Sequence, residues 1–253
     1  GDISSLTTAQ VEALTATQVK ALTTGQLEKL TTSQFSAMTA SDIVSLNAKQ
    51  VASLTTAQVA AMTTAQVAAL TKDEVSGMTT AQVRALTTTQ VGALTTAALA
   101  SFTTGQIGAF DTAQVNKLST SQAKALSATQ VASLSSTQVN ALSDAQVGVL
   151  TDKQVKALTT SQVGAMGTTQ LAALTTTQLA AMEAADVASL TSTQVNALTT
   201  NQLQALTETQ VKVLSTATVA GLSTAQASVL TSKQLAAFTT NQISSLSKIG
   251  RAH

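Results

Sequence analysis

The stretch "LTTAQVAAMTTAQVAALT" runs from Leu54 to Thr71 and contains one eight-residue phrase twice. Leu54 opens the first copy and Met62 opens the second. In each copy the leading apolar residue is followed by two threonines, an alanine, a glutamine and then Val-Ala-Ala. A phrase repeated in this way predicts a repeat architecture, in which each unit buries its apolar side chains against neighbouring units.

The same octad fills almost the whole chain of 253 residues. Every eighth residue from Leu6 to Leu246 gives 31 positions, and each of them is Leu, Met or Phe. No insertion shifts this register, so we predict a single continuous octad-repeat array of about 30 repeats over residues 1–246. Residues 247–253 leave the pattern and are predicted to form an irregular C-terminal tail.

Each octad also carries the signature of a helix start. The residue after the leading Leu is Thr or Ser, with Asn47, Asp111, Gly167 and Glu183 as the variants. A short side-chain oxygen at this position accepts an N–H of the first helical turn. Gln follows three residues later in 25 of 31 octads, and Thr-x-x-Gln is the capping box. The sequence therefore predicts a new short helix every eight residues.

These helices cannot be parts of one long helix, nor can they stand alone. Eight residues advance about 800° along an α-helix, so an octad stripe would spiral around it and face no fixed partner. A helix shorter than about 12 residues is too unstable by itself and needs its neighbours. We predict an all-α fold, a superhelical α-solenoid of very short helices with one helix per octad. The alternative is a β-solenoid, because Thr and Val favour strands.

The third position of the capping box prefers glutamine to glutamate, although a negative charge is favourable near a helix N-terminus. This preference predicts a half-buried position that penalises charge and uses both a donor and an acceptor. We expect each Gln to bond its own cap residue and also a backbone group of a neighbouring repeat. Ala98 and Thr218 cannot make that bond and should mark weak joints. Within residues 1–246, the positions without Gln are Asp2, Asp42, Glu74, Ala98, Asp186 and Thr218.

Composition excludes several classes of partner. The net charge is +1 and only 10% of residues are charged, which argues against nucleic acid because phosphate neutralisation needs many Lys and Arg. Thr and Gln interrupt every apolar run, so none approaches the roughly 18 residues that span a bilayer, and we expect no membrane insertion by this segment. The chain has no Cys, which removes disulfides and thiolate metal sites.

We find no candidate catalytic, cofactor-binding or metal-ligating residue in the sequence, and we predict that the chain is not an enzyme. The single histidine, His253, lies in the predicted tail, and no Ser or Thr nucleophile has a base beside it. The most charged segment, "TKDEV" from Thr71 to Val75, is predicted to be a solvated turn. Glu183 and Asp186 occupy the two capping-box positions and are explained by a helix start.

Uninterrupted octads of the "LTTAQVAAL" type, from Ile3 to Leu246, resemble the repeat tracts of large bacterial surface or secreted adhesin-like proteins. The resemblance implies a spacer or stalk, or a surface scaffold, located outside the cell or at its surface. Its partners would be flanking domains of a larger chain or another protein. One alternative is a protein- or peptide-binding solenoid. A less favoured one is an ice-binding array of Thr side chains, such as Thr56, Thr64, Thr80 and Thr88.

Overall fold

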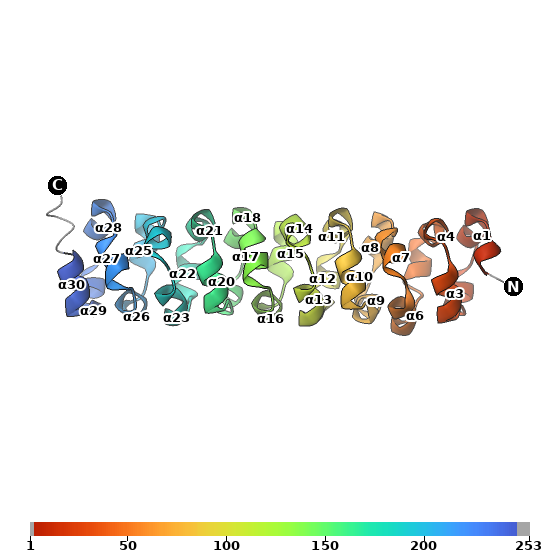
Figure 1. The fold of residues 1–253 in the computed structure, drawn as a ribbon, viewed down its shortest axis with the longest axis horizontal. Helices are drawn as coiled ribbons and strands as arrows, with labels where there is room; N and C mark the ends of the chain where they lie inside the picture. Colours follow the sequence, from red (N-terminus) through yellow and green to blue (C-terminus); the bar gives the residue numbers. More distant parts are fainter. Residues whose placement is uncertain (1–2, 247–253) are drawn as a thin grey trace. The chain divides into compact units, whose positions relative to one another are not determined.

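The computed structural model of the chain describes residues 3–246. Helices are the only regular secondary structure in this range, with short linkers between them and no strand (Figure 1). The predicted all-α solenoid with one helix per octad is confirmed, and the β-solenoid alternative is wrong. Contacts between residues group the chain into two compact units, residues 1–126 and residues 127–253. The prediction of one continuous array stays a prediction. The predicted tail, residues 247–253, lies outside the described residues, and so does His253.

The first unit begins with a short 3₁₀ helix and continues as fifteen α-helices within the described range. Their bounds are η1 (Ile3–Ser5), α1 (Thr8–Glu12), α2 (Ala16–Lys20), α3 (Thr24–Lys29), α4 (Thr32–Ala37), α5 (Ala40–Ile43), α6 (Ala48–Ser53), α7 (Thr56–Ala60), α8 (Thr64–Ala69), α9 (Lys72–Gly77), α10 (Thr80–Ala85), α11 (Thr88–Ala93), α12 (Thr96–Ser101), α13 (Thr104–Gly108), α14 (Thr112–Lys117) and α15 (Thr120–Ala125).

The second unit contains another fifteen α-helices in its described part. Their bounds are α16 (Ala128–Ala132), α17 (Ser136–Ala141), α18 (Asp144–Gly148), α19 (Asp152–Lys156), α20 (Thr160–Ala165), α21 (Thr168–Ala173), α22 (Thr176–Ala181), α23 (Ala184–Ala188), α24 (Ser192–Asn196), α25 (Thr200–Ala205), α26 (Glu208–Lys212), α27 (Thr216–Ala220), α28 (Thr224–Ser228), α29 (Ser232–Ala237) and α30 (Thr240–Leu246).

Two consecutive extended residues separate many of these helices, as the boundary between α8 and α9 illustrates. Leu70 ends α8 with φ −55° and ψ 130°, and Thr71 precedes α9 with φ −102° and ψ −180°. The Thr71 hydroxyl accepts the backbone N–H of Asp73 at 3.3 Å and so satisfies one donor of the first turn. The octad therefore starts and stops its own helix, as its capping residues predict.

Within each unit the helices wind into a superhelix. A helix packs against the third helix along the chain, so that α6 contacts α9 and α27 contacts α30 (Figure 1). The glutamine of a helix donates a hydrogen bond to the end of the fourth helix before it. For example, Gln58 in α7 donates to the carbonyl of Leu30, which follows α3. One superhelical turn therefore takes between three and four helices.

The core consists of the two apolar positions of each octad. The Val position is fully buried, as at Val67 and Val83, and the Leu position is nearly so, as at Leu70 and Leu86. The residue before each Leu is small in most octads, and at Gly77 in α9 the packing requires a small residue. A Cβ on Gly77 would lie 2.5 Å from the Ala48 carbonyl oxygen, which is too close for any side chain.

Candidate functional site

The recurring polar feature of the fold is a buried glutamine that joins two turns of the superhelix. Gln58 is only 1% exposed. Its Oε1 accepts the Thr55 N–H at 2.8 Å, and its own N–H donates to the Thr55 hydroxyl at 3.1 Å, which completes the capping box. Its Nε2 donates to two carbonyls at the end of α3, Leu27 and Leu30, both at 2.7 Å. One side chain thus starts its own helix and ties it to an earlier one.

We call this position the glutamine slot, and its bonds to the earlier helix the cross-helix bonds. Each cross-helix bond spans 28 to 31 residues of sequence. The prediction that Gln bonds both its cap and a neighbouring backbone is confirmed, with the fourth helix back as the neighbour. Glutamines with these bonds are Gln34, Gln50, Gln58, Gln66, Gln82, Gln90, Gln106, Gln114 and Gln122 in the first unit, and Gln162, Gln170, Gln178, Gln194, Gln202, Gln210, Gln226, Gln234 and Gln242 in the second.

The buried position of the slot explains why glutamine is preferred to glutamate. A carboxylate accepts hydrogen bonds but donates none, whereas the amide has N–H groups to offer the two carbonyls. Each neutral hydrogen bond contributes about 1 kcal/mol net, and an unpaired buried group costs about 1–3 kcal/mol. The repeated slots therefore add stability at every turn of each unit.

Asp42 and Glu74 place a carboxylate in the slot and keep only the capping half of its bonds. Both are 2% exposed. The Thr39 N–H donates to Asp42 Oδ2, and the Thr71 N–H donates to Glu74 Oε2, each at 2.8 Å. The predicted solvated turn from Thr71 to Val75 is therefore wrong, because α9 begins there and Glu74 is buried. The prediction rested on the high density of charged residues in this segment, of which Lys72 and Asp73 are indeed exposed.

Asp186 is the third acidic slot, and one of its oxygens has no partner. The side chain is 3% exposed, its Oδ1 accepts the Thr160 hydroxyl at 3.0 Å, and its Oδ2 is buried without a hydrogen bond. Burial raises the pKa of Asp186. The hydrogen bonds from Thr160 and from the Glu183 backbone lower that pKa, and the negative charge of Glu183 raises it further. The ionised form of Asp186 is therefore less favourable than that of an exposed aspartate.

Glu183 does not play the capping role that its position suggests. It is the N-cap residue of α23, yet its side chain makes no capping hydrogen bond. The predicted capping box between Glu183 and Asp186 is therefore wrong on the Glu183 side, although α23 does begin at Ala184. A side chain as long as Glu is a poor N-cap, because the short oxygen-bearing side chains fit that geometry best.

Ala98 and Thr218 fill the slot without a donor for the earlier helix. Ala98 is 1% exposed, and the Thr218 hydroxyl lies 2.8 Å from the Ser215 hydroxyl. The helices α12 and α27 accordingly have an N-cap bond but no capping box. The missing cross-helix bonds are as predicted, and the weakness of these two joints stays a prediction.

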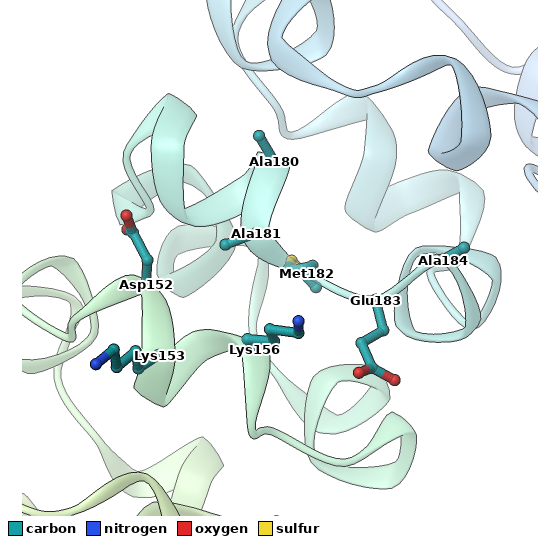
Figure 2. Close-up of a pocket in the computed structure, with 8 residues that line it drawn as sticks. All are labelled: Asp152, Lys153, Lys156, Ala180, Ala181, Met182, Glu183 and Ala184. Carbon is teal, nitrogen blue, oxygen red and sulfur yellow. The ribbon is translucent and has the colours of Figure 1, made fainter.

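A shallow hollow of about 560 Å³ lies on the second unit beside the Asp186 slot (Figure 2). Asp152, Lys153 and Lys156 of α19 line one side, and Glu183 lies on the other. In Figure 2 Lys156 extends towards the side of Glu183, whereas Lys153 points away from the hollow. The remaining lining is alanine together with Met182, so the hollow offers few groups that converge on a ligand.

Exposed threonines occupy the first position of several helices. Thr56, Thr64 and Thr80 are exposed at the starts of α7, α8 and α10. Since a turn takes between three and four helices, threonines of consecutive helices point to different sides of the superhelix. The ice-binding array of Thr side chains stays a prediction.

Two further kinds of site are missing from the described residues. Between residues 3 and 246 there is no group of three or more His, Cys, Asp and Glu side chains that could hold a metal ion. Among the same residues no helix combines the length and the apolar character that crossing a membrane requires.

Comparison with known protein families gives one match. A family model described as the ALTTAQ repeat matches residues 1–32, 35–72, 73–104, 92–120, 99–136, 130–160, 152–184, 179–216 and 209–240. Together these segments cover far more than half of the chain. No curated protein matches it.

Proposed function

The chain belongs to the ALTTAQ repeat family, and from this premise we propose that it is a structural, non-catalytic repeat segment. Its role is that of a spacer or stalk, or of a surface scaffold, in a larger protein. The proposal assigns no reaction and no cofactor to the chain. The number of octads is the property that matters for this role, because each octad adds one helix to the array.

The observation that carries this proposal is the repetition of the glutamine slot. In octad after octad the polar groups are used for the start of the helix and for the helix four places back, as at Gln82 and Gln202. The apolar groups are used for the core. Little is left over for a ligand, whereas a scaffold needs only these contacts.

We further propose that the segment belongs to a bacterial protein and works outside the cell or at its surface. The support is the resemblance of the octads to repeat tracts of adhesin-like proteins. Protease treatment of intact cells that produce the protein tests this proposal. Cleavage of the segment on intact cells is the expected result, and protection until the cells are lysed would contradict it.

The spacer role is tested by changing the number of octads. The chain has no Cys, so Thr8→Cys and Thr240→Cys provide two unique labelling positions, and both residues are exposed. We expect the label-to-label distance, measured by electron paramagnetic resonance or single-molecule fluorescence in dilute protein, to shorten with each deleted octad. Residues 55–62 are a suitable first deletion, because the register on either side is kept.

A second pair of labels gives the matched control. Thr8→Cys and Thr56→Cys both lie in the first unit, so deletion of residues 199–206 from the second unit should leave their distance unchanged. A terminal distance that ignores octad number, or that spreads over a broad distribution, would contradict the spacer role.

A further inference from the structure

We propose that the slot of Asp186 binds a calcium ion, held by two carboxylates and by backbone carbonyls at the end of α19. The carboxylates are those of Asp186 and Glu183, at the start of α23. The carbonyls are those of Val155, Lys156 and Leu158, and all five residues belong to the second unit. This inference goes beyond the structural role proposed above and does not depend on it.

The first observation is the unpartnered oxygen of Asp186. The side chain is 3% exposed, and between residues 3 and 246 its Oδ2 is the one buried side-chain oxygen or nitrogen without a hydrogen-bond partner. Removing a carboxylate oxygen from water is costly when nothing replaces the water. Buried carboxylates are therefore normally paired with a positive group or bound to a metal ion.

The second observation is the convergence of carbonyls in an ordinary slot. In the slot of Gln202 a single Nε2 atom lies 3.2, 3.0 and 2.6 Å from the carbonyl oxygens of Leu171, Ala172 and Leu174. These carbonyls belong to residues 31, 30 and 28 positions before the glutamine. Each such slot therefore surrounds one point with three carbonyl oxygens.

The slot of Asp186 has the same carbonyls but no amide to fill that point. The residues 31, 30 and 28 positions before Asp186 are Val155, Lys156 and Leu158. Val187, next to Asp186, is fully buried, as the same position is in the neighbouring octads. The Val155 carbonyl accepts the Leu158 N–H at 3.1 Å and still has its second lone pair. An aspartate offers these carbonyls no N–H, so their lone pairs are available to a cation.

Glu183 supplies the second carboxylate and makes this acidic slot different from that of Asp42. There the N-cap residue is Thr39, and Asp42 Oδ2 accepts its N–H at 2.8 Å and its hydroxyl at 2.7 Å. Glu183 has no hydroxyl, and its side chain makes no capping hydrogen bond. Asp186 accepts the Thr160 hydroxyl instead, and the negative charge of Glu183 disfavours its ionised form. Two acids thus share one slot, where a divalent cation would neutralise both.

This set of ligands suits calcium better than magnesium. Ca²⁺ binds about six to eight oxygens of carboxylates, carbonyls and waters, at about 2.3–2.6 Å and in a flexible geometry. The two carboxylates balance its charge, and the three carbonyls add neutral oxygens from the backbone. Mg²⁺ demands a nearly ideal octahedron at about 2.0–2.1 Å and releases its water reluctantly. Carbonyls that are spaced to receive an amide do not provide that geometry.

The hollow in Figure 2 gives the ion a route from solvent. Its lining includes Glu183 and Ala184 at the start of α23 and Lys156 at the end of α19, which are the two places that carry the ligands. In Figure 2 the Lys156 side chain extends towards the side of Glu183. Its ammonium group is therefore the cation of the protein that competes with calcium, and an ammonium group that filled the slot would prevent calcium binding.

Calorimetric titration of Ca²⁺ into the full chain, freed of metal with a chelator, tests the proposal. We expect one site per chain with a dissociation constant of about 10⁻⁴–10⁻³ M, the range of extracellular calcium-binding modules. The melting temperature should also rise with Ca²⁺ concentration, because the ion binds the folded chain. The absence of saturable Ca²⁺ binding, or equally tight binding of Mg²⁺, would overturn the proposal.

The variant that removes the site without weakening the fold is Asp186→Gln. Its amide should donate to the carbonyls that end α19, as Gln202 does in its own slot, and so take the position of the ion. We expect Ca²⁺ binding to weaken by more than about tenfold, because a neutral amide replaces a charged ligand. In metal-free buffer the variant should melt no lower than the parent chain. Unchanged Ca²⁺ binding by this variant would overturn the site.

Glu183→Gln is the second variant, and it removes a carboxylate that makes no capping bond. It should keep the melting temperature of the metal-free chain and weaken Ca²⁺ binding by about tenfold, because affinity depends on the number of charged ligands. This variant decides the question if Asp186→Gln proves unstable. Ca²⁺ affinity equal to that of the parent chain would overturn the two-carboxylate site.

The matched control is Asp152→Asn, which removes a carboxylate from the opposite side of the same hollow. Asp152 is exposed at the first position of α19 and is not one of the proposed ligands. Its substitution should leave Ca²⁺ affinity within about twofold of the parent value, since the ion lies in the slot and is held by its ligands there. Weakening equal to that of Glu183→Gln would place the ion in the open hollow and overturn the slot as its site.

Discussion

The slots of Gln210 and Asp186 lie in the same unit and at the same depth, yet they are bonded differently. Gln210 is 2% exposed, and its Nε2 donates to the carbonyls of Leu179 at 2.9 Å and Met182 at 2.8 Å. Asp186 is 3% exposed, accepts one hydroxyl from Thr160 and leaves Oδ2 without a partner. The first slot joins two turns of the superhelix, and the second does not.

The packing around the two slots is nevertheless the same. Val187 and Leu190 beside Asp186 are 0% and 4% exposed, and Val211 and Leu214 beside Gln210 have the same values. The apolar positions therefore set where each helix lies, whereas the hydrogen bonds of the glutamine set the stability of the contact between two turns. Four predictions test this division, in order of decreasing effect.

The largest effect is expected when the packing itself is broken. Leu179 of α22 is fully buried, so Leu179→Ala should lower the free energy of unfolding by about 2–5 kcal/mol through lost burial and a cavity. Urea denaturation of dilute protein measures this change. Leu235→Ala is the matched control, because Leu235 has the same octad position and is 37% exposed. Similar losses for both would show that burial does not set the strength of packing.

The next effect removes the cross-helix donor and leaves the packing in place. Gln210→Glu should cost about 1–3 kcal/mol of unfolding free energy, because a buried carboxylate then faces two carbonyls. Gln18→Glu makes the same change in an exposed slot without cross-helix bonds and should be nearly neutral. Thermal and urea denaturation of both variants provide the measurement. An equally neutral Gln210→Glu would mean that the cross-helix bonds add nothing.

A smaller gain is expected when the acidic slot is converted to the common one. Asp186→Gln supplies an amide to the carbonyls of Val155 and Leu158 at the end of α19, so it should raise the unfolding free energy by about 1 kcal/mol. Asp186→Asn is the control, since its amide is one methylene shorter and reaches less far. If Asp186→Gln destabilised the protein instead, the Thr160 hydrogen bond would outweigh the restored joint.

The smallest effect concerns the pH dependence of stability. Because burial raises the pKa of Asp186 above its ordinary value of 3.8, the folded state binds a proton more readily than the unfolded state. The resulting stabilisation is fully present below pH 3.8 and is lost as the pH rises through the folded-state pKa. Urea denaturation across acidic pH should show this trend as the difference between the parent chain and Asp186→Asn. A difference of the opposite slope would contradict it.

Much of this architecture could be predicted from sequence because each octad contains the signals for its own helix start and for its own buried positions. The capping box at Thr55 and Gln58, and the preference for Gln over Glu, predicted both a helix start and a second bond. The partner of that bond could not be predicted, because the number of helices per turn depends on the packing angle between helices. The same applies to the close approach of Gly77 to Ala48.

The exceptions were harder to predict than the rule. The high local charge made Glu74 look solvated, although it occupies the slot position and only its neighbours Lys72 and Asp73 are exposed. The unpaired Oδ2 of Asp186 depends on a side chain one methylene too short and on the position of Thr160, 26 residues earlier. That the Nε2 of Gln10 makes no cross-helix bond among the described residues could not be predicted either, because its octad has the same sequence pattern as the octads with a buried slot.

The 28-to-31-residue span of the cross-helix bonds has a kinetic consequence. Folding slows as contacts join residues that are farther apart in the chain, relative to its length. Here the sequence separation of the contacts is set by the superhelical turn. Adding octads therefore increases the number of residues in the chain without increasing the sequence separation of any of these contacts. When a nascent or translocating chain emerges, little more than one superhelical turn must be accessible before the first cross-helix bonds can form. Folding of such a chain can therefore keep pace with its emergence, from its first residues to its last.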